Sequence, residues 1–260
     1  MTTVMPAADD SRLRTAALAL LALALAGCAT TAERNPADPL QPMNRGIYRF
    51  IDSIDRAALR PVAVAYRDHT PAWFRTGVGN FYQNLTTPGT AVNNLLQGKP
   101  VAFAQDTLRF VINTTLGWGG VLDVASGAGL PQHDEDLGQT LGKWGVPAGP
   151  YLVVPLLGPS TLRDLPTRVA TTLLEPLYWF DTGNARWGSL ALSVVNTRAR
   201  LLPLDETLDG VYDKYAFIRN AYLQRRQYLV YDGNPPEEPL DEEFLDEATE
   251  DESDTAPPPP

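Results

Sequence analysis

The sequence predicts an all-α protein with a short hairpin-like loop and disordered termini. Apolar residues recur at helical spacing through most of the region from 41 to 232. The only segment rich in strand-forming residues is 151–154. No run of about 18 apolar residues follows residue 28, so a bundle of conventional membrane-spanning helices is not expected.

Residues 1–28 are expected to be a lipoprotein signal peptide. Arg12 and Arg14 precede an apolar run at 16–26, which is shorter than the roughly 20 residues of a transmembrane helix. The run ends at Leu25-Ala26-Gly27-Cys28, which matches the bacterial lipobox, where the cysteine thiol receives diacylglycerol and the new amine is acylated. Cys28 is the only cysteine, so it cannot form an internal disulfide. The alternative is an ordinary signal peptide with a leftover cysteine.

The lipobox places the mature chain on a membrane through Cys28. More than one acyl chain is needed for stable attachment, and lipoprotein processing supplies this. Ala29, rather than aspartate, follows the cysteine, which favours the outer over the inner membrane. Residues 29–40 are expected to form a short polar tether.

The C-terminal segment 233–260 is expected to be a disordered acidic tail. It holds eleven acidic residues, has no lysine or arginine, and ends at Pro257–Pro260. Without it, the net charge of −10 becomes +1. The helical domain at 41–232 therefore has no basic excess for binding nucleic acid.

Capping and breaking signals divide this domain into helices. The first helix is expected at 43–59. Pro61, just after it, either breaks the helix or begins a new one. Thr70-Pro71 and Thr87-Pro88 each pair an N-cap residue with a proline at the first helical position, so helices are expected to begin there. Gly98 closes the second of these. Further helices are expected at 100–116, 121–125, 136–143, 160–173, 175–180, 185–201 and 211–231.

The stretch 142–164 holds four glycines and four prolines. Gly145 and Gly149 predict a tight hairpin-like turn, and Gly158-Pro159-Ser160 predicts a stop followed by the N-cap of a helix. This loop either is a buried turn between helices or shapes a passage for an apolar ligand. Composition alone favours the buried turn.

In the expected helix at 185–201 the polar face is narrow and the apolar face is wide, the reverse of a usual surface helix. A single polar stripe follows one side of it, and nearly everything else except Arg198 is apolar. The stripe either faces water or a polar lumen, with the rest against protein or lipid, or it is the thin solvent edge of a core helix. The stripe consists of Arg186, Ser189, Ser193, Asn196 and Arg200.

Two other expected helices have unusual faces. In the helix at 100–116, Asp106, Arg109 and Asn113 form a narrow polar sector between two apolar faces. The helix at 211–231 carries repeated tyrosines beside Arg225 and Arg226, which suits a bilayer interface or packing on a partner protein.

Signals for catalysis are weak throughout the chain. His133 with its neighbouring carboxylates is a poor metal motif, and His69 is expected at the surface. There is no Gly-x-Ser-x-Gly elbow, and Trp144 stands where a P-loop requires serine or threonine. No catalytic residue, metal or cofactor is therefore expected.

Several short motifs occur in a fixed order along the body, after the lipobox. Together they make the chain resemble the MlaA (VacJ) family of outer-membrane lipoproteins, over roughly residues 38–232. Two features depart from the family pattern: the long n-region with Asp9 and Asp10, and the long acidic tail. The motifs are Asp38-Pro39-Leu40 with Asn44-Arg45, then Arg60-Pro61-Val62-Ala63, Leu141-Gly142 with Gly149-Pro150-Tyr151, and Thr161-Leu162-Arg163-Asp164.

The resemblance implies a ring of amphipathic helices around a central channel, set in the periplasmic-facing leaflet of the outer membrane. It implies that the protein removes mislocalised phospholipids from the outer leaflet and passes them towards a soluble periplasmic lipid carrier, which maintains lipid asymmetry. It further implies association with a porin trimer and a hairpin loop that gates the channel. In this chain that loop would be Gly145, Val146, Pro147, Ala148, Gly149 and Pro150.

Helical geometry and the resemblance together predict which residues line the channel. Moving a charged headgroup through hydrocarbon is costly, so a polar lining is needed. Arg186 and Arg200 could offset the phosphate charge, with Ser189, Ser193 and Asn196 as hydrogen-bonding partners. A second wall is expected from Asp106, Arg109 and Asn113.

Two other functions compete with transport. A structural adaptor lipoprotein would dock on a porin without conducting lipid, and it would not need a water-accessible lumen. A phospholipid-remodelling enzyme is disfavoured, because neither histidine has a credible catalytic partner.

Overall fold

The computed structural model describes residues 38–155, 157–174 and 183–236. The signal peptide with Cys28, most of the tether, the helix expected at 175–180 and the tail from residue 237 lie outside the described residues. The expected all-α class is confirmed, with one small two-stranded sheet. In chain order the elements are α2 (Gln41–Ile54), the π-helical η1 (Asp55–Leu59), α3 (Arg60–His69), α4 (Ala72–Leu96), α5 (Pro100–Thr115), α6 (Val124–Gly127), α7 (Leu137–Lys143), β1 (Tyr151–Val154), β2 (Gly158–Thr161), α8 (Asp164–Leu174), α10 (Asn184–Leu201), α11 (Leu204–Asp209) and α12 (Lys214–Val230).

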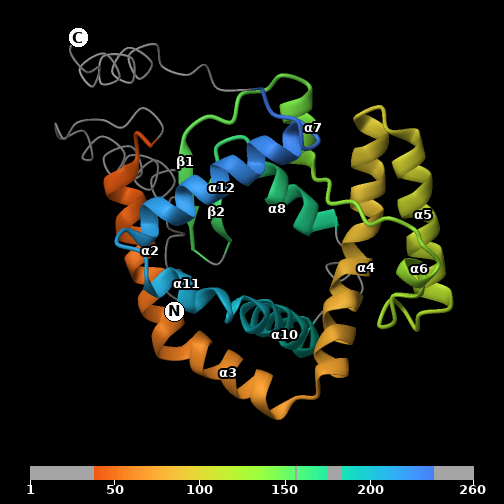
Figure 1. Cartoon of the computed structure of the whole chain (residues 1–260), viewed down its shortest axis with the longest axis horizontal. Helices are drawn as coiled ribbons and strands as arrows, with labels where there is room; N and C mark the ends of the chain where they lie inside the picture. Colours follow the sequence, from red (N-terminus) through yellow and green to blue (C-terminus); the bar gives the residue numbers. More distant parts are fainter. Residues whose placement is uncertain (1–37, 156, 175–182, 237–260) are drawn as a thin grey trace, which may run out of the picture.

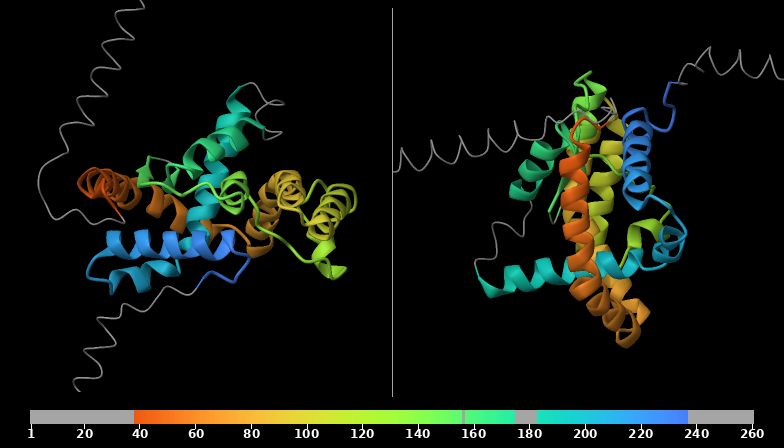
Figure 2. Two further views of the ribbon diagram at one scale, coloured as in Figure 1. Left: turned by 90° about the horizontal axis from the view of Figure 1, so that it is seen from above. Right: turned by 90° about the vertical axis from the view of Figure 1, so that its left-hand side faces the viewer.

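The helices outline a ring. In Figure 1, α2, α3, α4, α7 and α12 follow one another around the outline, with α8 and α10 inside it. Both views of Figure 2 show α8 and the N-terminal part of α10 projecting from one side of the body, with α12 on the opposite side. Within the described ranges, no helix combines the length and the hydropathy needed to cross a bilayer.

The first helix does not stop at Pro61. The chain remains helical from α2 through η1 to α3, and Pro61 lies in the first turn of α3. A proline there lacks the N–H that an α-helix would use, and the wider π-helical turn just before it takes up the mismatch. Asp55 of this turn accepts two hydrogen bonds from Arg198, at 2.8 and 2.9 Å, which joins it to α10.

The helix start expected at Thr87-Pro88 is wrong, because α4 continues through Pro88 to Leu96. The interior proline removes one backbone hydrogen bond. Packing on α5 holds α4 on both sides of it: Asn84 donates to Thr114 at 2.9 Å, and Asn94 donates to Asp106 at 2.7 Å. The expected end of α4 is confirmed, since Gly98 follows the helix with φ of 75°.

The hairpin lies later in the chain than expected. Residues Gly158–Thr161 do not end a strand and cap a helix; they form β2, paired antiparallel with β1 so that Tyr151 faces Thr161 and Val154 faces Gly158. The helix expected from residue 160 therefore begins only at Asp164. The last expected helix likewise begins later, at Lys214 instead of residue 211, because Asp213 caps α12 by accepting from the N–H of Ala216.

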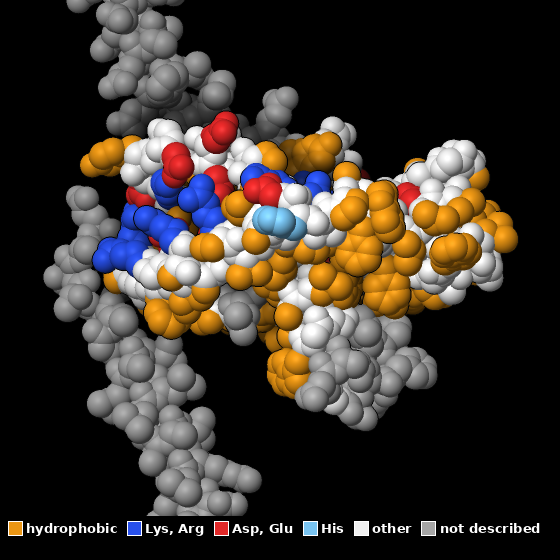
Figure 3. Space-filling model, turned by 90° about the horizontal axis from the view of Figure 1, so that it is seen from below, with side chains coloured by type: hydrophobic (Ala, Val, Ile, Leu, Met, Phe, Trp, Pro, Cys, Tyr) orange, Lys and Arg blue, Asp and Glu red, His pale blue; other side chains and the backbone are white. Residues whose placement is uncertain are grey.

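The distribution of polar and apolar side chains between interior and surface is the reverse of that in a typical soluble domain. The buried side chains of the described residues are mostly polar, and the buried apolar clusters are small, as in Ala63, Ala199 and Leu202. Many large apolar side chains instead lie on the surface, including Trp73, of which 74% is exposed, and Trp118. Figure 3 shows apolar side chains covering much of the right-hand part of the molecule, the side on which Figure 1 places α4 and α5. Such an exterior favours contact with an apolar environment.

Candidate functional site

The polar stripe of α10 faces inward, towards α3 and α4. The hydroxyl of Tyr82 on α4 donates to the carbonyl oxygen of Ser189 at 2.6 Å and lies 2.8 Å from the Ser189 hydroxyl. The hydroxyl of Tyr66 on α3 donates to the Asn196 side chain at 3.1 Å, and Asn196 is only 3% exposed. Two members of the predicted stripe are thus held by tyrosines from two different helices.

The opposite face of α10 carries exposed apolar side chains. Trp187 is 69% exposed, and Leu190 and Val194 are exposed as well. A helix with its polar stripe against protein and its apolar face outward has the polarity expected for an element in contact with lipid tails. The stripe is therefore not simply the solvent edge of a core helix, and its role in lining a channel stays a prediction.

The charged ends of the stripe differ in their surroundings. Arg200 is exposed, and its guanidinium lies beside Gly79 of α4. A Cβ atom added to Gly79 would be 3.5 Å from Nη1 of Arg200 and 3.6 Å from Nδ2 of Asn196. Arg186 is half-buried and has interactions of its own, and Ser193 is half-buried. The arginine outside the stripe, Arg198, pairs with Asp55 and Asp205.

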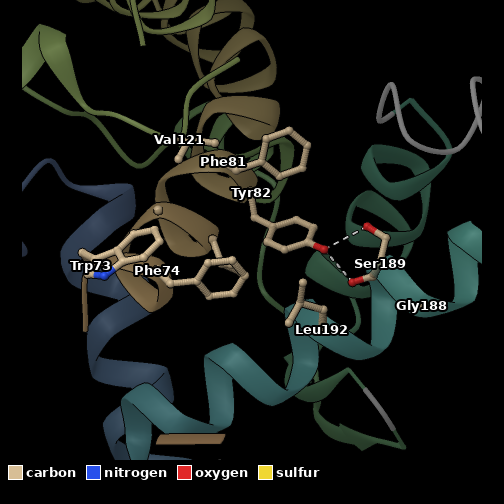
Figure 4. A pocket seen from close by; sticks show the side chains of 10 residues that line it. Trp73, Phe74, Phe81, Tyr82, Val121, Gly188, Ser189 and Leu192 are labelled. Atoms are coloured by element: carbon tan, nitrogen blue, oxygen red, sulfur yellow. Dashed lines mark hydrogen bonds between the residues drawn. The ribbon is translucent and has the colours of Figure 1, made fainter. Parts of the chain in front are cut away.

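A cleft of about 350 Å³ opens between α4 and α10. The α4 side is formed by Trp73, Phe74, Gly77, Val78, Phe81 and Tyr82. Gly188, Ser189 and Leu192 form the α10 side, and Val121 closes one end. Figure 4 shows the rings of Phe74 and Tyr82 turned towards Leu192, with the Tyr82–Ser189 hydrogen bonds at the edge. The cleft can accept an apolar group and offers it almost no polar contact.

The predicted second wall is buried inside the protein. Asp106 is 1% exposed; it accepts from Asn94 and lies 3.0 Å from Nδ1 of His133. Arg109 donates two hydrogen bonds to Asp123, at 3.0 and 3.2 Å, and burial is nearly complete for its side chain.

The third member of that wall, Asn113, shares the same partner. It donates to Asp123 at 3.0 Å and accepts from the N–H of Ala125 at 2.9 Å. Burial raises the pKa of Asp123, but hydrogen bonds from Ser126 and Asn113 more than offset this and leave the pKa below its ordinary value. These contacts fasten the segment 117–130 to α5. A channel-lining role for the three residues stays a prediction, and their internal partners weigh against it.

The predicted gating loop is an extension of the β-hairpin. Its Ala148 carbonyl accepts from the N–H of Arg163 at 3.0 Å, and its Pro150 carbonyl accepts from Leu162 at 3.1 Å. Gly145 and Gly149 have φ of 89° and 68°, which glycine adopts readily. The loop therefore runs alongside the residues that follow β2, rather than turning back on itself at Gly145–Pro150.

A buried polar cluster anchors the hairpin to the first helix. The Asn44 side chain pairs with strand β1 as a neighbouring strand would: it donates to the Tyr151 carbonyl at 2.9 Å and accepts from the Val153 N–H at 3.0 Å. It also donates to Asp38 at 3.0 Å. The Tyr215 hydroxyl donates to the same carboxylate, and burial raises the pKa of that hydroxyl.

Sequence reasoning missed the cleft and this cluster. The α4 residues of the cleft recur at i, i+4 and i+8, and a helical wheel of 72–96 would have shown that face. The family motif includes Asp38 and Asn44, but nothing local shows that Asn44 pairs with strand β1, because Tyr151 and Val153 lie more than 100 residues away. Within the described ranges, no group of three histidine, cysteine, aspartate or glutamate side chains is placed to hold a metal ion.

Comparison with known proteins gives consistent matches over the whole described body. The model of the MlaA lipoprotein family matches residues 36–229. The chain is 40% identical over 236 residues to the intermembrane phospholipid transport system lipoprotein MlaA of Escherichia coli (strain K12), covering 88% of this chain and 94% of that protein. The protein of the same name from Haemophilus influenzae is 34% identical over 241 residues, covering 88% of this chain and 95% of that protein.

A solved structure agrees with these matches. It is described as the structural basis for maintenance of bacterial outer membrane lipid asymmetry. One of its chains superposes with a TM-score of 0.67 at 38% identity, covering 74% of this chain and 98% of that chain.

Proposed function

This chain belongs to the MlaA lipoprotein family, and we propose that it is an intermembrane phospholipid transport lipoprotein of the outer membrane. It removes phospholipids from the outer leaflet and passes them towards a soluble periplasmic lipid carrier. The observation that carries this proposal is the orientation of α10, whose polar stripe faces the protein while its apolar face lies outward. The named relatives support the same function.

The passage runs beside the inward stripe of α10. A headgroup that leaves water needs compensating charges and hydrogen bonds, and its acyl chains need none. Arg200 supplies a positive charge, while Ser189 and Asn196 supply polar atoms along the same side of the helix. Ser193 lies between them. Asp106, Arg109 and Asn113 are left out of this passage, because they lie on α5 and not on α10, with their side chains buried against α4 and the segment 117–130.

The protein acts from the periplasmic-facing leaflet, anchored by acyl chains on Cys28. Its apolar exterior keeps the ring among lipid tails, and the hairpin loop Gly145–Pro150 gates the passage. A porin trimer holds the ring in place and a soluble carrier receives the lipid. Transfer through this chain involves no catalysis, which predicts that the purified protein releases no free fatty acid from phospholipid.

The test is to change Arg186 and Arg200 together to leucine. A hydrogen bond to a charged group contributes about 1.5–3 kcal/mol, so we expect clearance of outer-leaflet phospholipid to slow about tenfold to a hundredfold. The measurement is labelling of phosphatidylethanolamine on intact cells with a membrane-impermeant amine reagent, in cells whose only copy is the variant.

Two controls define the outcome. Arg49→Leu removes one positive charge from an exposed position on α2, away from α10, and is expected to leave clearance unchanged. Lysine at both 186 and 200 is expected to retain most of the activity. A normal amount of outer-leaflet phospholipid in cells with the double leucine variant would contradict the assignment of Arg186 and Arg200 to the channel lining.

A further inference from the structure

We propose that the cleft between α4 and α10 holds one acyl chain of a membrane glycerophospholipid, with the lipid phosphate directed towards Arg200. This inference rests on the proposed function and adds to it a defined resting place for a lipid in transit. The proposal rests on the chemistry of the cleft, its size, its surroundings and the position of Arg200.

The lining selects for hydrocarbon. Its side chains are apolar except for Tyr82 and Ser189, and the hydroxyls of these two residues are hydrogen-bonded to each other. A ligand with polar groups would lose its hydrogen bonds to water on entry and find no replacement, which is costly. An acyl chain loses nothing of this kind.

The size of the cleft suits part of an acyl chain. Its volume is about 350 Å³. It lies at the lower end of the range of about 300–1,000 Å³ that small-molecule sites occupy.

The mouth of the cleft opens among exposed apolar side chains. Trp73 and Phe74, both part of the lining on α4, are exposed. Gly188, the lining residue across the cleft on α10, is exposed as well. With the apolar exterior in the membrane, lipid tails would therefore stand directly at the opening.

Arg200 marks the other end of the lipid. It lies eleven residues after Ser189, which is three turns or about 16 Å along the same stripe of α10. Among the described residues no carboxylate pairs with it, whereas its neighbour Arg198 already pairs with Asp55 and Asp205. An exposed guanidinium without an acidic partner is available to a phosphate.

Gly188 allows the cleft to be filled without damage to the fold. A Cβ added there would have nothing within 4 Å, so the ring of Gly188→Phe has space to enter the cleft. Replacing an interior helical glycine also favours the helix by up to about 1 kcal/mol. Gly46 of α2 is likewise helical, exposed and free of neighbours within 4 Å, so Gly46→Phe is the matched control.

The experiment uses the full lipidated chain in vesicles of phosphatidylethanolamine and phosphatidylglycerol that contain a phospholipid with a diazirine in one acyl chain. After irradiation, mass spectrometry of proteolytic peptides locates the lipid adducts. We expect adducts on Phe81 and Leu192, reduced at least fivefold in Gly188→Phe and unchanged in Gly46→Phe. Arg200→Leu should reduce labelling by this phospholipid but not by a diazirine diacylglycerol, which has no phosphate.

Adducts spread over Trp187 and Leu190 according to their exposure, with the cleft unlabelled, would overturn the proposal. So would cleft labelling that Gly188→Phe leaves intact, or a photoreactive residue at position 192 that captures a protein in cells. The clearance assay separates this result from the wider function. If the cleft is unlabelled while the Arg186 and Arg200 double variant still blocks clearance, the transport function stands and only the resting place is lost.

Discussion

At the scale of single residues, the interior of this protein is held by polar side chains that substitute for main-chain partners. Asn44 satisfies both a carbonyl and an N–H of strand β1, and it does so with the side chain fully buried. Asn84 and Asn94 join α4 to α5 through side-chain partners instead, Thr114 and Asp106. A buried polar group without a partner is costly, so each of these contacts is sensitive to substitution.

Asn44→Ala is expected to lower the free energy of unfolding by several kcal/mol. It leaves the Tyr151 carbonyl and the Val153 N–H without partners in a buried site, at about 1–3 kcal/mol each. Urea denaturation of the detergent-solubilised protein, followed by circular dichroism, measures the change. Asn80→Ala is the control, because Asn80 makes one hydrogen bond to Val121 near the surface. Equal stability of the two variants would contradict this account of Asn44.

The ion pairs of Arg226 predict how stability depends on pH. Burial raises the pKa of Asp164, but hydrogen bonds from Arg163 and Arg226 more than offset this and leave the pKa below its ordinary value. Asp136, which also accepts from Arg226, has its pKa lowered with the same balance of causes. A carboxyl whose folded pKa is depressed stabilises the protein above its unfolded pKa of about 3.9 and loses that contribution as pH falls through the folded pKa.

We therefore expect the denaturation midpoint to be constant from about pH 7 to pH 5 and to fall below about pH 4. In Arg226→Met the buried Asp164 and the half-buried Asp136 lose a compensating partner, so their pKa values rise towards the unfolded value. The variant is then less stable at pH 7, and its further loss of stability below about pH 4 is smaller. The adjacent Arg225 pairs with an exposed Asp134, so Arg225→Met should leave the profile unchanged. Thermal melts across this pH range in both variants provide the comparison.

At the scale of elements, α10 and the hairpin carry the functional geometry. The inward stripe and outward apolar face of α10 result from contacts with two other helices, through Tyr66 and Tyr82. The hairpin is fixed by Asn44 at β1 and by main-chain bonds at Ala148 and Pro150. Both elements are therefore positioned by partners distant in the sequence.

A cysteine scan of α10 tests its orientation in the membrane. Ser193→Cys, on the stripe, is expected to react with a small water-soluble maleimide in the lipidated protein. Leu190→Cys, on the exposed apolar face, should react only after denaturation, because lipid covers it. Cys28 is the only native cysteine, so the background is low once it is acylated. Equal protection of both positions would favour the porin-docking adaptor without a water-accessible lumen.

At the scale of the whole molecule, a polar interior inside an apolar exterior is the main property. Small buried apolar clusters cannot by themselves account for a stable body in water, because hydrophobic burial is the dominant favourable term in folding. In the proposed membrane setting, lipid buries the exposed apolar side chains, so that the stability of the ring depends on its membrane.

Cys28→Ala in the full chain is expected to leave the protein bound to lipid vesicles. Salt at about 1 M shortens the Debye length to about 3 Å and removes electrostatic binding, whereas burial of apolar surface persists. Flotation of vesicles with and without this salt measures the bound fraction. Release of the variant by salt alone would show that the acyl anchor, and not the ring, holds the protein.

Local signals in the sequence determined the helical class, the ends of several helices at Gly98, Pro100 and Asp136, and the family. The lipoprotein anchor stays a prediction from the same kind of signal. These signals depend on capping, on residue spacing and on motifs, which act over a few neighbouring residues. Only the tertiary structure decided that α4 passes through Pro88, that Asp106, Arg109 and Asn113 pair internally, and that the stripe of α10 faces two tyrosines. The physical reason is that the burial and orientation of a side chain depend on what is packed against it, and those partners lie far away along the chain.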